Sequence, residues 1–235
     1  HREQAAEIAG VLDVDASCVQ VVGAGYREDV FYCEHANSRE PTARAEPTLL
    51  YAGKLSNSKG LPQLLDAVEI LQHGIPKIHL HVAGSGAGEE ADNLRARIES
   101  MSRLVTWHGQ LSPEELAAQM RKSQVFVLPS FYEGLALVIV EAIARGCRVA
   151  ATGLPGTVEL AQRLPGSIAL VDPPAMRTVD APREEELPAF VERLAAAIQS
   201  SLGEPPLTHA QSLVQPFTWK AVFDRIEEVW RASRV

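Results

Sequence analysis

The sequence has 235 residues, of which 46% are hydrophobic, and a formal net charge of −8. A chain of this length buries the core of one α/β domain. The negative charge argues against a general nucleic-acid-binding protein, because neutralisation of phosphates by basic residues dominates the affinity of such proteins. An acidic chain still binds a single anionic ligand, since exposed charges more than about 8 Å apart are largely screened at physiological salt.

The sequence also indicates a compartment. Its three cysteines, Cys18, Cys33 and Cys147, form no CxxC pair, which is typical of free thiols under reducing conditions. No signal-peptide pattern is visible, and the most apolar run, 135–144, is too short to cross a bilayer. We expect a cytoplasmic protein, with peripheral attachment to the inner face of the membrane through a segment outside this chain as an alternative.

The amino-terminal part is expected to lead into the main domain. Residues 1–17 predict an amphipathic helix with Ile8, Val11 and Leu12 on one side, and a short apolar strand is expected at 19–22. Residues 34–47 are polar and contain two prolines, so we expect a loop or linker there.

From residue 48 strand and helix patterns alternate. Strands are expected at 48–52, 78–83, 104–108, 125–128, 148–151 and, more weakly, 167–171. Helices are expected between them at 61–72, 89–101, 113–122, 134–145 and 157–163. Apolar strands that alternate with helices indicate a mostly parallel sheet with helices on both faces. The prediction is a doubly wound, Rossmann-like α/β domain over residues 18–215.

The pattern loosens after Pro173, where helices are expected at 185–202 and 219–231. In the last helix Trp219, Phe223 and Trp230 belong to a series of apolar residues spaced three and four apart. Residues 216–235 are therefore expected to form a carboxyl-terminal amphipathic helix.

In an open parallel sheet, ligands bind beyond the carboxyl ends of the strands, where the strand order reverses. The first such loop, 53–60, contains Gly53, Lys54 and Lys59 and leads into a helix. Two ammonium groups beside a helix amino terminus suit a diphosphate. A solvated loop with two surface lysines is the alternative. The Walker order is absent, so a P-loop nucleotidase is disfavoured.

Glycines at 84, 86 and 88 raise a second possibility, a dinucleotide site of an NAD- or FAD-dependent oxidoreductase. The third glycine comes too early for G-x-G-x-x-G. The next strand ends in Trp107, His108 and Gly109, without the acid that holds a ribose diol. We therefore disfavour that reading, and keep His108 as a residue at the right edge to touch a base.

The segment 130–142 carries two acids, Glu133 and Glu141, eight residues apart. Eight helical residues span about 12 Å, comparable with the distance from a transferred sugar, across a diphosphate, to a ribose. Glu141 is the single charge within 135–144 and needs a partner if it is buried. That partner is either a ligand or a structural lysine or backbone amide.

Several of these segments together resemble one family. Residues 53–60 match the pattern G-[RK]-x4-K-G of a loop that binds the donor phosphates. Residues 130–146 match a segment that contains the E-x7-E motif. Segments 21–31 and 151–160, and the stretch through Gly109, are also similar. The chain resembles the donor-binding domain of retaining glycosyltransferases with two Rossmann domains (GT-B), in the family often called family four.

The resemblance implies roles for matching positions. Lys54 and Lys59, beside Gly53, would neutralise the donor diphosphate, and Glu141 would accept from the ribose hydroxyls. Glu133 would contact the transferred sugar, as nucleophile or stabiliser. Further donor contacts would come from backbone at Gly109, Gln110 and Leu111 around the base, and from amides at Gly134, Leu135, Ala136 and Leu137.

The implied reaction is transfer of a hexose from a UDP-, GDP- or ADP-sugar with retention, without metal or other cofactor. Leaving-group charge would be stabilised by basic residues and amides. Lys54 stands where arginine is common, and Ala136 replaces a frequent glycine, which narrows the sugar pocket. The family's acceptor-binding amino-terminal domain would precede His1, so we expect this chain to be inactive alone. A nucleotide-sugar-binding module without catalysis remains the alternative.

One further pair of residues has a spacing that a metal site could use. His79 and His81 would face one side of a strand, but no third ligand is evident, and packed, hydrogen-bonded histidines are the simpler explanation.

Overall fold

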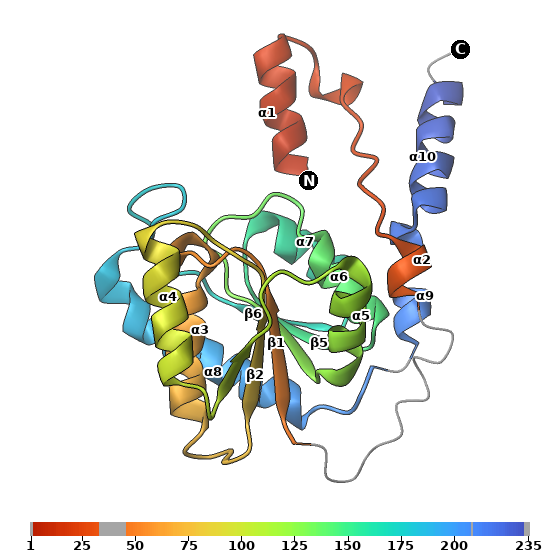
Figure 1. Cartoon of the computed structure of the whole chain (residues 1–235). Coiled ribbons are helices and arrows are strands. Elements are labelled where there is room, and N and C mark those ends of the chain that lie inside the picture. Colours follow the sequence, from red (N-terminus) through yellow and green to blue (C-terminus); the bar gives the residue numbers. More distant parts are fainter. Residues whose placement is uncertain (1, 33–45, 208, 233–235) are drawn as a thin grey trace.

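The structure, a computed structural model, describes residues 2–32, 46–207 and 209–232. Its centre is a six-stranded sheet in the order β3-β2-β1-β4-β5-β6 (Figure 1). All neighbouring strands run parallel. The strands are β1 Thr48–Ala52, β2 His79–Ala83, β3 Val105–Trp107, β4 Val125–Leu128, β5 Arg148–Thr152 and β6 Ile168–Val171. The predicted doubly wound, parallel α/β fold is confirmed, and the strand order reverses between β1 and β4.

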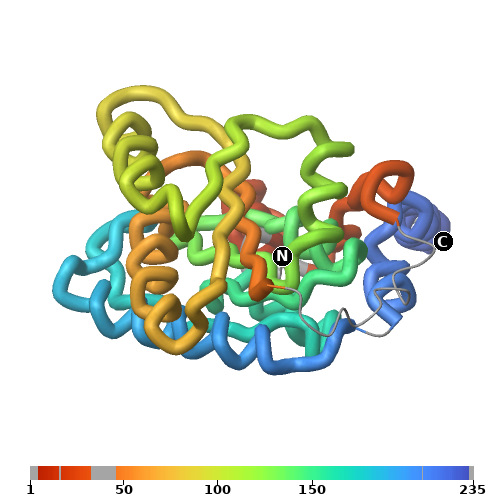
Figure 2. Tube along the Cα trace, turned by 60° about the horizontal axis from the view of Figure 1, so that its bottom comes forward, coloured from red at the N-terminus to blue at the C-terminus, as the bar shows by residue number. Residues whose placement is uncertain are grey.

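Helices cover both faces of the sheet, which lies between them in Figure 2. One face carries α3 Leu61–Leu71, α4 Glu89–Ser100 and α8 Leu187–Gly203, and the other carries α2 Glu28–Phe31, α5 Pro113–Lys122, α6 Leu137–Ala144 and α9 Ala210–Val214. Successive strand residues supply the two cores, because side chains alternate across a strand. In β1, Leu49 and Tyr51 pack on the α3 side and Leu50 on the α6 side.

Helix boundaries differ from the predictions at two places near the sheet edge. Helix α7, Pro155–Arg163, begins two residues before the predicted start, with Pro155 in the first turn, where its missing N–H is no loss. Helix α6 begins at Leu137 instead of residue 134. Ala136, its N-cap, has φ −78° and ψ 71°, outside the helical region.

The strand predicted at 19–22 is absent. Within this segment, the Val22 carbonyl accepts from Arg225 Nε at 2.9 Å. Four residues later, Tyr26 makes an isolated parallel bridge with Thr218. Tyr26 N–H donates to the Phe217 carbonyl at 3.0 Å. A strand needs a neighbour along its length, and here the neighbour is mainly helical. The loop predicted at 34–47 and Cys33 lie almost wholly outside the described residues.

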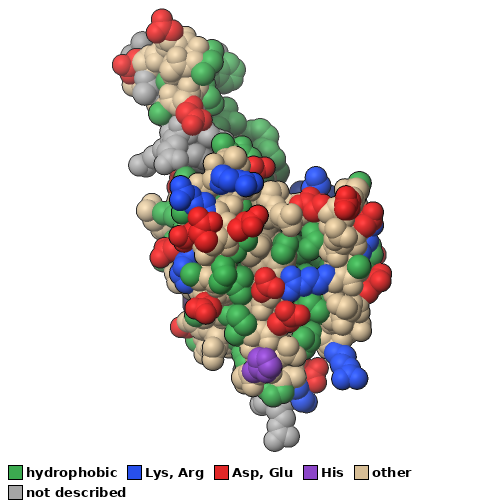
Figure 3. All heavy atoms as spheres, turned by 90° about the vertical axis from the view of Figure 1, so that its left-hand side faces the viewer, with side chains coloured by type: hydrophobic (Ala, Val, Ile, Leu, Met, Phe, Trp, Pro, Cys, Tyr) green, Lys and Arg blue, Asp and Glu red, His purple; other side chains and the backbone are tan. Residues whose placement is uncertain are grey.

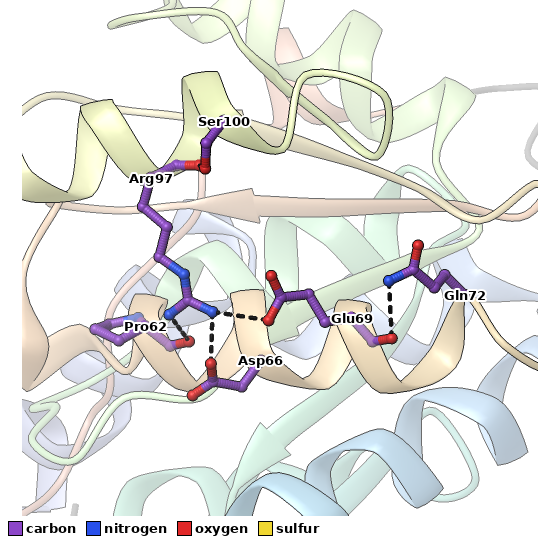
Figure 4. A network of polar contacts seen from close by, with 6 residues as sticks. All are labelled: Pro62, Asp66, Glu69, Gln72, Arg97 and Ser100. Atoms are coloured by element: carbon purple, nitrogen blue, oxygen red, sulfur yellow. Dashed lines mark hydrogen bonds and ion pairs between the residues drawn. The ribbon is translucent and has the colours of Figure 1, made fainter.

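Arg97 fastens α4 to α3 (Figure 4). Its guanidinium bonds the Pro62 carbonyl and the carboxylates of Asp66 and Glu69. The network therefore holds α4 against α3.

Two helices extend beyond that edge, α1 Arg2–Leu12 and α10 Trp219–Ala232 (Figure 1). Figure 3 shows the part of the molecule that projects above the body of the domain, and hydrophobic side chains are visible on it. Val11 of α1 is 85% exposed, and Phe223 and Trp230 of α10 are 60% and 61% exposed. The predicted apolar stripe of the last helix is therefore present, and most of it is uncovered in this chain.

Candidate functional site

The carboxyl edge of the sheet contains a hollow of about 650 Å³. It lies over the ends of β1 and β2 and reaches the loop between β3 and α5. Four residues predicted from the sequence line it: Gly53, Lys54, Gln110 and Leu111. The other lining residues are small or apolar: Ala52, Ala83, Gly84, Ser85, Gly86, Ala87 and Leu116. Gly84 and Gly86 belong to the glycine-rich loop that raised the possibility of a dinucleotide site.

Backbone hydrogen bonds join the loops that form this hollow. Gly53 N–H donates to the Ala83 carbonyl at 3.0 Å, and Gly84 N–H donates to the Gly109 carbonyl at 2.7 Å. Gly84 has a φ of +129°, and a Cβ there would lie 1.9 Å from the Gly53 carbonyl oxygen. Only glycine allows this approach. The hollow is thus preformed by backbone contacts, with the Lys54 side chain exposed at its wall.

Lys59 and Glu133 meet at the point where the strand order reverses. Lys59 Nζ lies 2.8 Å from Glu133 Oε1 and 3.3 Å from the Tyr132 carbonyl oxygen. The Ser130 hydroxyl also donates to Glu133 Oε1, at 2.8 Å. Sequence spacing gave no signal for this pair, since its members are 74 residues apart. In the free chain the second lysine is therefore held by a carboxylate, and the Glu133 oxygen that accepts both bonds is fixed.

The loop before α6 offers backbone donors beside this pair. Within the described residues, the N–H groups of Gly134, Leu135 and Ala136 have no hydrogen-bond acceptor. Leu137 N–H donates to the Leu135 carbonyl at 2.9 Å. Because α6 begins only at Leu137, the separation of about 12 Å that we derived from a continuous helix between the two acids does not apply.

Glu141 lies on α6, partly buried and near Arg27, which precedes α2. Burial raises the pKa of the Glu141 carboxyl above its ordinary value, and the positive charge of Arg27 opposes that rise. Arg27 itself bonds Asp29 and lies 4.0 Å from Glu114. No hydrogen bond to the Glu141 carboxylate is found in the described part of the chain. The sequence suggested a structural lysine as the partner of Glu141, whereas the structure places an arginine, Arg27, nearby.

His108 does not line the hollow. Its Nε2 lies 3.0 Å from Nδ1 of His81, while His79 Nε2 lies 2.8 Å from the Thr106 hydroxyl. Burial lowers the pKa of His81 to about 4, so this ring is neutral at physiological pH. No group of three or more His, Cys, Asp or Glu side chains suited to a metal ion occurs within residues 2–32, 46–207 and 209–232.

Comparison with known proteins identifies the family. The family model described as "Glycosyl transferases group 1" matches residues 46–181, more than half of the chain. The chain belongs to this family. The matched region of this group 1 chain contains the hollow, the Lys59–Glu133 pair and Glu141. The family resemblance stated from the motifs is confirmed.

Relatives of this group 1 chain include glycogen synthase from Mycobacterium tuberculosis, 29% identical over 205 residues that cover 85% of this chain and 45% of the relative. A D-inositol 3-phosphate glycosyltransferase from an Arthrobacter species is 32% identical over 164 residues, covering 65% of this chain and 38% of the relative. The chain thus spans about half the length of the curated relatives it matches, or less.

Solved structures share the fold. Sucrose-phosphate synthase from Thermosynechococcus elongatus has a TM-score of 0.59 and 25% identity, covering 91% of this chain and 52% of that one. Anabaena HepE in complex with UDP has a TM-score of 0.62 at 18% identity, covering 94% and 59% of the two chains. Among the described residues, no helix has the length and apolar character needed to cross a membrane.

Proposed function

We propose that this chain is the donor-binding domain of a retaining glycosyltransferase, and that the hollow at the carboxyl edge of its sheet binds a nucleotide-diphosphate hexose. The proposal rests on the cationic side chains, the carboxylate and the backbone amides that lie along this edge of the sheet. A preformed hollow holds Lys54, and the loops at the strand-order reversal bring Lys59, Glu133 and unsatisfied backbone amides together. Group 1 membership and a structural neighbour solved with UDP support it.

In the proposed complex the diphosphate lies between Lys54 and the amides of Gly134 to Ala136. These amides have no acceptor within the described residues, so phosphate or sugar oxygens would satisfy them. Each hydrogen bond to a charged oxygen contributes about 1.5–3 kcal/mol. Lys59, bonded to Glu133 and to the Tyr132 carbonyl, keeps one further proton for a phosphate oxygen. Glu141 would accept hydrogen bonds from the ribose hydroxyls, and the hexose would lie against Glu133.

The proposed chemistry is cleavage of the bond between the anomeric carbon and the diphosphate oxygen. The acceptor hydroxyl forms the new bond on the same face, and its proton leaves to solvent or to the departing diphosphate. Lys54, Lys59 and the amides stabilise the negative charge that develops on the leaving oxygen. Ser130 and Lys59 together hold one oxygen of Glu133, which orients the carboxylate towards the sugar. We propose that no metal ion or other cofactor is required.

We further propose that the acceptor is recognised by a separate domain that docks on the exposed apolar faces of α1 and α10. Those faces carry the exposed side chains of Val11, Phe223 and Trp230. Both helices extend beyond the carboxyl edge of the sheet (Figure 1). Transfer by residues 1–235 alone is then expected to be negligible, although binding of the donor nucleotide is retained. The same proposal includes a cytoplasmic location, at the inner face of the membrane where the docking domain attaches to it.

Thermal unfolding with and without nucleotides tests the proposal. A ligand at 100 times its dissociation constant stabilises a domain by about 2.7 kcal/mol, which for this size raises the Tm by roughly 5–11 °C. We expect such a shift with UDP, GDP or ADP and none with NAD. Lys54→Ala should abolish most of the shift, while Lys77→Ala, an exposed lysine before β2 at the opposite edge of the sheet, should not. The absence of a shift with every nucleoside diphosphate would refute the proposal.

A binding module without catalysis is the second candidate, because the described contacts of Glu133 are structural in the free chain. The two are separated by assaying transfer or donor hydrolysis with the docking domain restored. An enzyme should lose activity on Glu133→Ala while its affinity for the nucleoside diphosphate stays within about threefold. A binding module should show no transfer before or after the substitution.

A further inference from the structure

A hydrogen bond joins two polar side chains that line the hollow. Ser85 follows β2, and Gln110 follows β3. The Ser85 hydroxyl donates to Oε1 of Gln110 at 3.2 Å, and both residues line the hollow. Their backbones are held as well, since the Ser85 carbonyl accepts from Leu55 N–H and the neighbouring Gly109 carbonyl accepts from Gly84 N–H. The pair is thus carried by fixed loops and not by free ends.

The hollow has two chemically different ends. Lys54 provides the cationic wall, and Leu111 and Leu116 provide the apolar one, next to Gln110. If the proposed function holds, the diphosphate takes the cationic end. The flat apolar base then lies against the two leucines, with its polar edge within reach of Gln110.

We propose that Gln110, oriented by Ser85, selects donors whose base presents a carbonyl oxygen, as uracil and guanine do, over donors whose base presents an amino group there, as cytosine and adenine do. This inference rests on the proposed function. A glutamine amide carries one acceptor group and one NH₂ donor group. Ser85 occupies the acceptor, and the Nε2 hydrogens have no acceptor in the described part of the chain. The Nε2 hydrogens of Gln110 can donate to a carbonyl oxygen of the base. An amino group at that position of the base would instead place its own N–H donors against those of Gln110.

The discrimination comes mainly from the wrong base. A mismatched amino group leaves two donors unpaired when the base covers the amide, which is more unfavourable than the loss of one bond. One such mismatch is expected to weaken binding about tenfold, the equivalent of roughly 1.4 kcal/mol. Both side chains are exposed in the free chain, so the pair is expected to affect ligand choice and not the stability of the fold.

Nucleotide titration by calorimetry tests the proposal with bases of matched size. Wild type should bind UDP about tenfold more tightly than CDP, or GDP about tenfold more tightly than ADP. Gln110→Glu offers only acceptors, so the UDP/CDP and GDP/ADP affinity ratios should fall to one or below. Taking ratios cancels the repulsion between the new carboxylate and the diphosphate. Ser85→Ala removes the hydrogen bond that orients the Gln110 amide, so the amide can rotate by 180°. This variant should bring the UDP/CDP and GDP/ADP affinity ratios closer to one.

The control is Gln162→Glu, an exposed glutamine on α7 that does not line the hollow, and it should leave every ratio unchanged. Equal affinity of the wild type for both members of each pair, or ratios that Gln110→Glu does not change, would overturn base selection and leave donor binding intact. Failure of all four nucleotides to bind would overturn the proposed function as well.

Discussion

Replacing Gly60 by alanine is expected to separate the two loops that bring Lys59 to Glu133. Gly60 has a φ of +68°, and a Cβ there would lie 2.0 Å from the Pro129 carbonyl oxygen and 2.7 Å from its carbon. Both atoms belong to the backbone of the opposite loop, so no side-chain rotation relieves the contact. Ser58 and Phe131 fix the same approach, because Phe131 N–H donates to the Ser58 carbonyl at 2.9 Å.

Three contributions set the size of the effect. The left-handed conformation disfavours alanine by about 1–2 kcal/mol, and forcing atoms into a packed contact adds about 1–3 kcal/mol. Loss of backbone freedom in the unfolded chain offsets these by less than about 1 kcal/mol. We expect the free energy of unfolding to fall by roughly 3 kcal/mol, which lowers the Tm by roughly 6–12 °C for a domain of this size.

Thermal melts followed by circular dichroism measure this change. Gly74→Ala is the matched control, because Gly74 has no positive φ and a Cβ there would meet nothing within 4 Å. It should change stability by less than about 1 kcal/mol. Gly60→Ala should also weaken UDP binding at a temperature where the fold is intact. A variant that melts like Gly74→Ala would show that the two loops do not need this contact.

Two further changes separate charge from structure. Because burial raises the folded-state pKa of Glu141 above 4.5, its ionised form destabilises the fold as the pH rises through that pKa. Glu141→Gln should therefore have a higher Tm than wild type at pH 7, and this gain should vanish below about pH 4.5. The variant should also bind UDP more weakly. Tm curves of variant and wild type that run parallel across this pH range would contradict the reasoning. Arg97→Ala removes the partly exposed network between α3 and α4 and should lower the free energy of unfolding by about 1 kcal/mol. UDP affinity should not change. Urea unfolding measures the loss of stability, and Arg121→Ala, at an exposed arginine, is the control.

The sheet could be predicted from the sequence because its strands are short apolar runs whose neighbours in the chain are helices. The bounds of α5 could also be predicted, because Ser112 and Glu115 at its start have the spacing of a capping box, which the structure shows. The apolar run 19–22 predicts a strand that the structure lacks, since an apolar run alone does not reveal whether a strand partner exists. Gly134 to Ala136 were assigned to a helix because their neighbours are strongly helical, although their backbone is not.

The site was only partly visible in the sequence. Gly53, Lys54, Gln110 and Leu111 were found because they follow strands, and the fold places strand ends at one edge. The Lys59–Glu133 pair and the influence of Arg27 on Glu141 depend on distances between segments far apart in the chain. The position of His108 after a strand predicts a contact with the base. The orientation of its ring towards His81 depends instead on the pairing of β3 with β2.

The bridge between Tyr26 and Thr218 means that the chain enters and leaves the sheet-and-helix body at adjacent points. A unit whose two ends lie side by side can be inserted into a surface loop of another protein with little distortion of either partner. Fluorescent groups attached beside Tyr26 and Thr218 would therefore lie close together, and energy transfer between them would report a ligand-induced change in their separation.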